Sequence, residues 1–312
     1  MRLPTAFILL ASVLSGSLQA SEARDWLLRM AEAGNRESFS GTYIYERSGN
    51  FSTHRIWHQA QPPASSRERL LQLDGPAQEL LLADGQVRCA TEALAGHFAG
   101  MQYLDGRQLD VARLEQTYEL KFLGNSRVAG RSAVVLLLLP RDADRYAREL
   151  HLDYGTGLPL KSLLLNEQGE LLERMQFTSL NPRPLEAKDL QPVTRCIALP
   201  EPPAASRSQS AWQIGWMPAG FVAAGGVERP GKVSGLPLQT LVFDDGLARF
   251  SVFIEAVDDV VAGDAKGQVG PTVVVSRPMS TPGGQFMVTV VGEIPLATAE
   301  RVLLSVNQGG VR

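Results

Sequence analysis

The sequence lacks an excess of basic residues and has no long hydrophobic run. Lysine and arginine total 30 against 33 aspartates and glutamates, which leaves a formal net charge of −3. Such a chain has no broad positive surface for a polyanion, and this argues against nucleic acid as a partner. The apolar run near the N-terminus, 6–14, is well short of the roughly 20 residues that a membrane-spanning helix needs.

This N-terminal run instead has the layout of a secretory signal. Arg2 precedes the apolar stretch, and small residues follow it up to Ala20, after which cleavage is predicted. No cysteine follows the run, so a lipid-modified N-terminus is not expected. A retained anchor is the alternative. The mature chain is therefore predicted to be exported, most simply to a bacterial periplasm.

Cysteine is scarce, because Cys89 and Cys196 are the only two in the chain. Their spacing is far from a CxxC redox motif. Export to an oxidising compartment favours one structural disulfide, which would tie the hairpin around Cys89 to the end of the first domain. Two separate buried thiols are the alternative.

Histidine is equally scarce, with four in the chain. His54 and His58, if they share a strand, lie about 13 Å apart along one face and cannot bind the same metal ion. His97 and His151 add no ligand spacing. The sequence therefore predicts no metal site.

Catalytic motifs are missing as well. The sequence contains no nucleophile elbow, zinc-protease motif or phosphate-binding loop. The glycines of 155–157 fit a turn between strands, and the carboxylate pairs at 244–245 and 258–259 fit solvated turns better than acid–base dyads. We expect neither a catalytic site nor a cofactor, and no enzyme.

Strand periodicity dominates the chain after one N-terminal helix. Ser21 is a suitable N-cap for a helix whose apolar residues recur at helical spacing as far as Gly34 and Asn35. Asp84 and Gly85 then form a strong two-residue hairpin signal. The predicted strands of this region are 41–47, 53–58, 67–73, 78–83, 86–90, 118–128, 132–140, 146–154, 158–166 and 170–180. They indicate an antiparallel meander, interrupted by a second helix around 94–114.

The composition then changes to that of a linker, with three prolines among small polar residues at 199–210. The sequence thus predicts a signal peptide (1–20), a large first domain (21–198), this linker and a small second domain (211–312). The predicted elements of the second domain are strands at 213–217, 238–243, 248–255, 272–276 and 285–291 and a helix at 296–306. The predicted fold class is mainly β with helices (α+β).

Four segments together resemble the RseB/MucB family of periplasmic sigma-E regulators, most closely its MucB branch. They are FSGTYIYERSGN (39–50), HLDYGTGLPLKSLLLNEQGELLERMQFTSL (151–180), LVFDDGLARFSVFIE (241–255) and VTVVGEIPLATAERV (288–302). The resemblance covers essentially the whole mature chain. It implies a large N-terminal half-barrel, like that of lipoprotein carriers, with helices in its concave face, and a small C-terminal α+β domain.

The resemblance also implies a function. A protein of this kind binds the periplasmic domain of a MucA- or RseA-like membrane-anchored anti-sigma factor and protects it from site-1 proteolysis. Envelope-stress sigma factor activity and alginate production then stay repressed, and lipid or lipopolysaccharide is the implied effector. A periplasmic lipid or lipoprotein carrier is the alternative, although it has no evident need for the second domain. An enzyme ranks third, and a homo-oligomer is left open.

Aromatic residues gather in the first predicted hairpin. Phe39, Tyr43 and Tyr45 fall on one side of the first strand, and Trp57 follows in the second. In the implied half-barrel they are candidates for lining a lipid cavity. Ordinary core packing beneath the N-terminal helix is the alternative.

The 241–255 segment supplies the candidates for anti-sigma binding. It indicates two strands joined at Asp245 and Gly246, with Phe243 and Phe253 as contact or core residues and Arg249 as a charged neighbour. Strand addition at a sheet edge and burial of a helix in a groove both remain open as binding modes.

Overall fold

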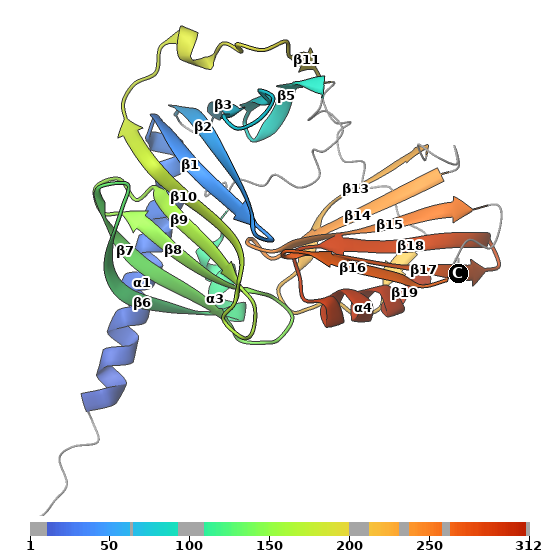
Figure 1. The fold of residues 1–312 in the computed structure, drawn as a ribbon. Coiled ribbons are helices and arrows are strands. Elements are labelled where there is room, and N and C mark those ends of the chain that lie inside the picture. Colours follow the sequence, from blue (N-terminus) through green and yellow to red (C-terminus); the bar gives the residue numbers. More distant parts are fainter. Residues whose placement is uncertain are drawn as a thin grey trace, which may run out of the picture.

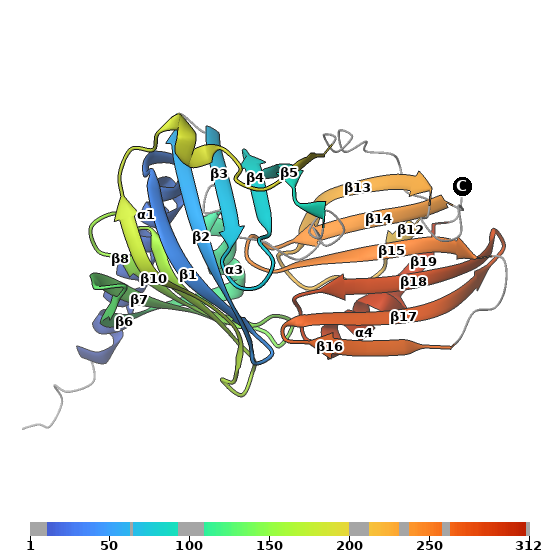
Figure 2. The same ribbon diagram turned by 45° about the horizontal axis from the view of Figure 1, so that its top comes forward.

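The computed structural model describes residues 11–62, 65–92, 109–199, 212–230, 237–257 and 263–309. Within them the chain forms two large antiparallel sheets that lie side by side (Figures 1 and 2). The predicted class, mainly β with helices, is confirmed. His97 and the predicted linker, apart from Leu199, lie outside the described residues.

The N-terminal sheet contains the ten predicted strands and one short addition. Its strands are β1 (Phe39–Arg47), β2 (Asn50–Gln61), β3 (Ser65–Gln72), β4 (Glu79–Ala83), β5 (Gln86–Ala90), β6 (Tyr118–Val128), β7 (Arg131–Pro140), β8 (Ala147–Asp153), β9 (Pro159–Leu165), β10 (Leu171–Pro182) and β11 (Ile197–Ala198). Their order across the sheet is β11-β5-β4-β3-β2-β1-β10-β9-β8-β7-β6. The pairing of β1 with β10 therefore joins two meanders into one sheet.

Two tight turns join neighbouring strands, and each has glycine at its second position. Ser48 and Gly49 join β1 to β2 with φ angles of 52° and 74°, and Asp84 and Gly85 join β4 to β5 with 54° and 73°. Two successive positive φ angles define a type I′ turn, which matches the twist of a hairpin. The hairpin predicted at Asp84 is thus confirmed.

Helix α1 (Ala11–Arg36) lies on one face of this sheet, which curves around it (Figure 1). Its buried residues Ala23, Leu27 and Met30 are at most 2% exposed. The shorter α3 (Val111–Thr117) packs on the same face. The predicted N-cap at Ser21 is wrong, because α1 passes through this residue without a break. None of the described helices is long and apolar enough to span a membrane.

The segment 183–199 crosses the opposite face of the sheet. It contains a 3-10 turn, η2 (Ala187–Leu190), and ends in β11, which pairs with β5 at the sheet edge. Cys196 is disulfide-bonded to Cys89, with their Cα atoms 5.5 Å apart. The segment is thus attached covalently to β5, the strand with which it also pairs.

Thiol labelling of the unfolded, unreduced protein tests this bond. We expect no free thiol, since Cys89 and Cys196 are the only cysteines and the structure joins them. Reduction should lower the free energy of unfolding by roughly 5 kcal/mol, because the bond spans 107 residues and restricts the unfolded chain. Two labelled thiols per unreduced chain would contradict the bond.

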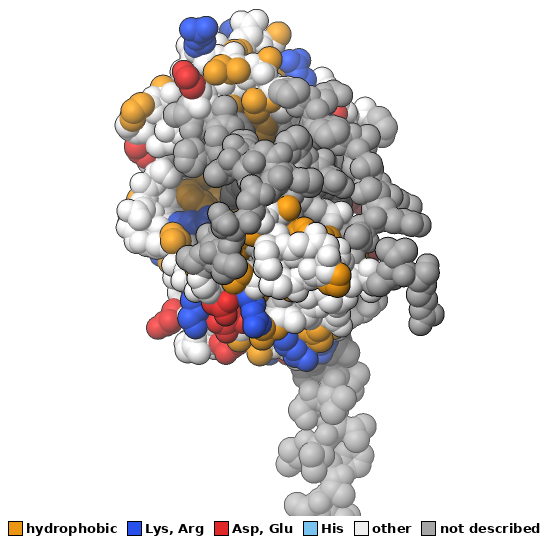
Figure 3. Space-filling model, turned by 90° about the vertical axis from the view of Figure 1, so that its right-hand side faces the viewer, with side chains coloured by type: hydrophobic (Ala, Val, Ile, Leu, Met, Phe, Trp, Pro, Cys, Tyr) orange, Lys and Arg blue, Asp and Glu red, His pale blue; other side chains and the backbone are white. Residues whose placement is uncertain are grey.

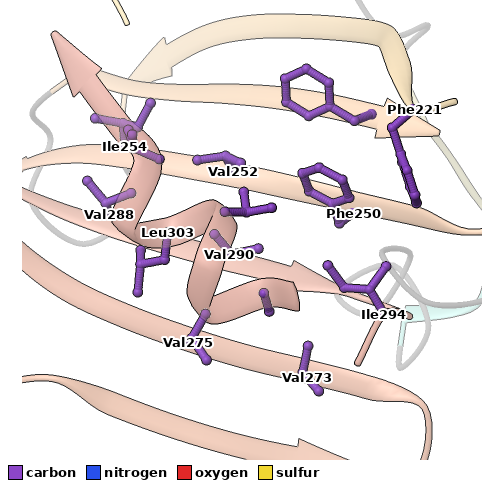
Figure 4. Packing of buried hydrophobic residues seen from close by; sticks show 14 of the residues in the cluster. Phe221, Phe250, Val252, Ile254, Val273, Val275, Val288, Val290, Ile294 and Leu303 are labelled. Carbon is purple, nitrogen blue, oxygen red and sulfur yellow. The ribbon is translucent and has the colours of Figure 1, made fainter. Parts of the chain in front are cut away.

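The C-terminal sheet has six strands in the order β13-β14-β15-β18-β17-β16. They are β13 (Val222–Pro230), β14 (Pro237–Asp244), β15 (Arg249–Val257), β16 (Ala265–Val269), β17 (Thr272–Thr281) and β18 (Gly284–Gly292), and a separate pair is formed by β12 (Trp212–Ile214) and β19 (Val306–Gln308). Helix α4 (Leu296–Ser305) covers one face. The core between them contains Phe250, Val252, Val290 and Leu303 (Figure 4).

Two strands of this sheet were not predicted. In β16, all five residues are exposed, so no apolar alternation marks it. In β13, alanines and glycines stand where β-branched and aromatic residues are typical of a strand. Both are edge strands, where pairing with one neighbour decides the conformation.

Candidate functional site

Phe39 and Tyr43, two of the predicted cavity residues, lie in one core cluster with Ala33 of α1. Phe39 and Tyr43 are 2% and 8% exposed, and both contact Phe177, with ring centroids 6.1 and 5.6 Å apart. Phe39 stacks on His58 at 5.1 Å and Tyr43 on His54 at 5.2 Å. We call this group the aromatic face. Its rings are packed as core, with Ala33 of α1 in the same cluster, so an acyl chain can reach them only if this packing opens.

Tyr45 lies farther along β1 and is only half-buried. Its hydroxyl donates to Glu173 Oε2 at 2.6 Å. Burial and the neighbouring Glu173 carboxylate raise the pKa of Tyr45 well above its ordinary value. The ring therefore keeps its proton and its hydrogen bond at any physiological pH.

Trp57 is not part of this group. It lies on the opposite face of the sheet, where it packs against Leu71, Leu185 and Leu190 beneath the segment 183–199. The guanidinium of Arg69 lies 4.2 Å from its ring centroid. In the structure Trp57 thus anchors this segment rather than joining Phe39, because alternate residues of a strand point to opposite faces.

The same segment is held by a buried carboxylate. Glu79 is fully buried and accepts hydrogen bonds from Arg69 Nε at 2.5 Å, Val193 N at 2.9 Å, and Thr194 N and Oγ1 at 2.9 and 2.7 Å. Burial alone would raise the pKa of Glu79, but the hydrogen bonds from Thr194 and Arg69 lower it. The ionised carboxylate is therefore the form that holds the segment.

A buried ion pair joins the two domains. Arg145, between β7 and β8, donates to Asp245 at 2.5 Å, and both side chains are fully buried. Tyr118 donates its hydroxyl to the same oxygen at 3.0 Å. The backbone N–H groups of Leu247 and Ala248 donate to the other oxygen at 2.8 and 2.7 Å. These four hydrogen bonds offset the cost of removing the carboxylate from water.

The rest of the Arg145 side chain is also satisfied. It donates twice to Asp142 at 3.0 Å and once to Ala219 O at 2.6 Å. Burial alone would lower the pKa of Arg145, but its hydrogen bonds to Asp142 and its charge partner Asp245 raise it. Arg145 is therefore a permanent cation between the domains.

Further polar contacts surround this ion pair. Each joins a residue of the N-terminal domain to one of the C-terminal domain: Arg113 to Asp244 at 3.0 Å, Tyr146 Oη to Ile294 O at 3.1 Å, and Asp144 to Thr298 Oγ1 at 3.0 Å. Specific hydrogen bonds thus determine how the two sheets sit against one another.

Residues of both domains line a small recess at this junction. They are Tyr118, Tyr146, Arg148, Leu164, Leu247, Ala248 and Glu293. Burial, with Glu173 nearby, raises the pKa of Glu293, and burial with the nearby carboxylates raises the pKa of Tyr146 to about 12. Among the described residues, no three histidine, cysteine or acidic side chains are placed to hold a metal ion.

The turn between β1 and β2 makes a second contact with the C-terminal domain. Arg47 donates to Thr272 Oγ1 at the start of β17, and its Nη2 lies 3.9 Å from Glu293 Oε1. Gly270 fits against Arg47 and Ser48. The hairpin that contains the aromatic face therefore also touches the second sheet.

The three candidates in 241–255 have different surroundings. Phe243 is 6% exposed and stacks on Phe250 at 5.2 Å within the core, so it is not available to a partner. Phe253 lies on the face away from α4, since its neighbours Val252 and Ile254 point into the core. Arg249 is exposed, with its Nη2 3.8 Å from Asp244.

The face of the C-terminal sheet away from α4 has two rows of aligned side chains, which we call the outer face. Its residues are Thr240, Phe253, Thr289 and Ser276 in one row and Val242, Ser251, Val291 and Val274 in the other. All are at least partly exposed. Figure 3, viewed from the C-terminal domain's side, shows hydrophobic side chains scattered over the surface, with charged ones at its top and in a larger group near its lower edge.

Two family models match this chain. The MucB/RseB N-terminal domain matches residues 22–194, and the MucB/RseB C-terminal domain matches residues 206–307. The chain belongs to the MucB/RseB family. Members of this family are regulatory proteins and not enzymes.

Curated and solved relatives agree with this assignment. The chain is 49% identical to the sigma factor AlgU regulatory protein MucB of Pseudomonas aeruginosa, over 98% of both chains. It is 26% identical to the sigma-E factor regulatory protein RseB of Salmonella typhimurium, over 77% of this chain and 76% of RseB. A crystal structure of MucB in complex with MucA(peri) superposes with a TM-score of 0.81 at 48% identity, over 93% of this chain and all of that one.

Sequence reasoning missed the residues that join the domains of this family member. Asp245 was interpreted as a solvated turn residue, yet its side chain is fully buried. A DDG turn between strands has the same local sequence pattern whether its second aspartate is solvated or buried. The buried partners Arg145 and Tyr118, 100 and 127 residues away, distinguish them, and no short-range signal could have identified these partners.

Proposed function

We propose that this chain is a periplasmic regulator that binds the periplasmic segment of a membrane-anchored anti-sigma factor. It shields that segment from site-1 proteolysis, so the envelope-stress sigma factor and alginate production stay repressed. The observation that carries this proposal is the likeness to MucB in complex with MucA(peri), which extends over 93% of the chain. Both domains are included in that likeness, so a function that needs only one of them is less well supported.

The outer face of the C-terminal sheet is the surface we assign to the partner. It presents a partly exposed Phe253 between Thr240 and Thr289, with Arg249 on the same strand. Aromatic and arginine side chains contribute most of the binding energy in protein interfaces. Val242 of this surface lies three residues before Asp245 of the interdomain ion pair, so the surface extends toward the junction of the domains.

A protection assay tests this assignment. The purified chain should prolong the lifetime of the periplasmic domain of P. aeruginosa MucA during digestion by its site-1 protease. Replacing a residue at the centre of an interface costs about 2 kcal/mol or more, so Phe253→Ala should weaken binding about 30-fold and shorten that lifetime.

Leu304→Ala is the matched control, because Leu304 is 65% exposed and belongs to α4, on the other side of the sheet. It should protect as well as the wild type. Equal protection by Phe253→Ala and the wild type would exclude the outer face as the binding surface. Failure of the wild type to protect would exclude the proposed function.

We further propose lipid or lipopolysaccharide as the effector, received at the aromatic face. Phe39 and Tyr43 offer apolar surface in a cluster that also contains Ala33 of α1, and we take movement of α1 to be what admits an acyl chain. Couplings between two ligands are typically about 1–3 kcal/mol, so saturating lipid A should weaken MucA binding about 5- to 150-fold. Equal MucA affinities with and without lipid A would remove the sensing role.

A further inference from the structure

The hairpin formed by β1 and β2 contacts both α1 and the C-terminal sheet. At its base, Phe39 stacks on His58, and His58 Nε2 lies 2.8 Å from Gly34 O near the end of α1. At its turn, Arg47 contacts Thr272 and Glu293. Eight residue steps of β1 span roughly 26 Å between these ends. One hairpin thus connects the helix over the aromatic face to the second domain.

The contact at the turn is closely fitted. Gly270 has a φ of 58°, and a Cβ added to it would lie 2.9 Å from Arg47 Cγ and 3.0 Å from Ser48 Oγ. A larger residue there would strain the backbone at this φ and force the Arg47 side chain to shift. Gly270 lies two residues before β17, whose Val274 and Ser276 belong to the outer face. A shift of the hairpin turn is therefore transmitted to a strand of the proposed partner surface.

The energy of this contact depends on the position of β1, because charged groups take part in it. The side chains of Arg47 and Glu293 are only 21% and 28% exposed. Glu293 also faces Glu173 and Arg148, and Glu173 accepts the hydrogen bond of Tyr45 from β1. A movement of β1 thus changes the balance of charge around Glu293, in a setting where water screens it weakly.

We propose that the β1–β2 hairpin transmits the effect of lipid from the aromatic face to the outer face. This proposal rests on the proposed function and names the route of its regulation. In the docked state the turn between β1 and β2 packs against Gly270, and the outer face binds the anti-sigma factor segment. In the undocked state α1 is separated from the hairpin base, so the acyl chain enters. Each ligand shifts the equilibrium through its differential affinity for the two states.

Arg47→Ala and Gly270→Ala test this route, because both favour the undocked state. Each variant should bind MucA at least about 5-fold more weakly and, by reciprocity, bind lipid A at least about 5-fold more tightly than the wild type. The effect of lipid A on MucA binding should shrink accordingly. Tighter lipid binding is the decisive measurement, since a variant that is merely damaged does not gain affinity.

Gly169→Ala is the matched control. Gly169 has a φ of 78°, so alanine meets the same backbone strain there, but nothing lies within 4 Å of the added Cβ. It should behave like the wild type in both titrations. If lipid A still weakened MucA binding by the wild type, but Arg47→Ala and Gly270→Ala bound lipid A no more tightly than the wild type, the route through the hairpin would be overturned. The effector role of lipid would then stand. A wild type insensitive to lipid A would overturn the effector role and the route together.

Discussion

Replacing Asp245 by alanine should lower the free energy of unfolding by about 3–5 kcal/mol. The substitution leaves Arg145 as a buried cation without its partner, and an unpaired buried charge costs this much in proteins. It also removes the acceptor for Tyr118 and for two backbone N–H groups. Urea denaturation followed by circular dichroism measures the loss.

Tyr118→Phe is the control for this experiment. It removes one hydrogen bond to Asp245 and leaves the ion pair intact, so it should cost only about 1 kcal/mol. If Asp245→Ala cost no more than Tyr118→Phe, the ion pair would not hold the domains together. Because the pair connects the domains, Asp245→Ala should also separate their unfolding into two transitions.

Replacing Glu79 by alanine should have an effect of similar size at neutral pH, about 3–5 kcal/mol. It leaves Arg69 buried without its carboxylate and frees the N–H groups of Val193 and Thr194. The disulfide still attaches the segment 183–199 at Cys196. The loss should therefore appear as faster hydrogen exchange in this segment as well as in the global free energy of unfolding.

The effect of Glu79→Ala should also depend on pH, with a defined sign. The pKa of Glu79 is lowered in the folded state. A carboxyl group whose pKa is lowered by folding stabilises the protein at pH values above its pKa in the unfolded chain, about 4.3. This contribution is lost as the pH falls through the pKa of the folded state. The difference between wild type and Glu79→Ala should thus shrink at about pH 3. A difference that grows in acid would contradict the ionised role of Glu79.

The positions of the strands were predictable from local patterns. The face of the sheet on which each side chain would be buried was not. Alternation and turn residues placed ten strands of the N-terminal sheet to within a few residues, because period-2 patterning and positive-φ turns are properties of short segments. Trp57 shows the limit. It was grouped with Phe39 and Tyr43, whereas its position one residue before His58 places it on the other face.

The candidate site depended on long-range contacts in the same way. Phe253 and Phe243 look alike in the sequence, and each lies in a strand rich in apolar residues on both faces. The core on the α4 side of the sheet includes Phe243, which stacks on Phe250, whereas Phe253 lies on the opposite face and is only partly buried. No pattern within 241–255 contains that information.

The sequence by itself determined most of the strands, the hairpin turn at Asp84 and the pairing available to the two cysteines, since each depends on neighbouring residues or on a count; the edge strands β13 and β16 were the exception. The tertiary structure alone decided that Asp245 is buried against Arg145, that Trp57 supports the segment 183–199, and that Gly270 receives the turn at Arg47. These contacts join residues about 100 or more positions apart. They depend on how the first sheet curves around α1 and on where the second sheet docks, and both follow from packing the whole chain.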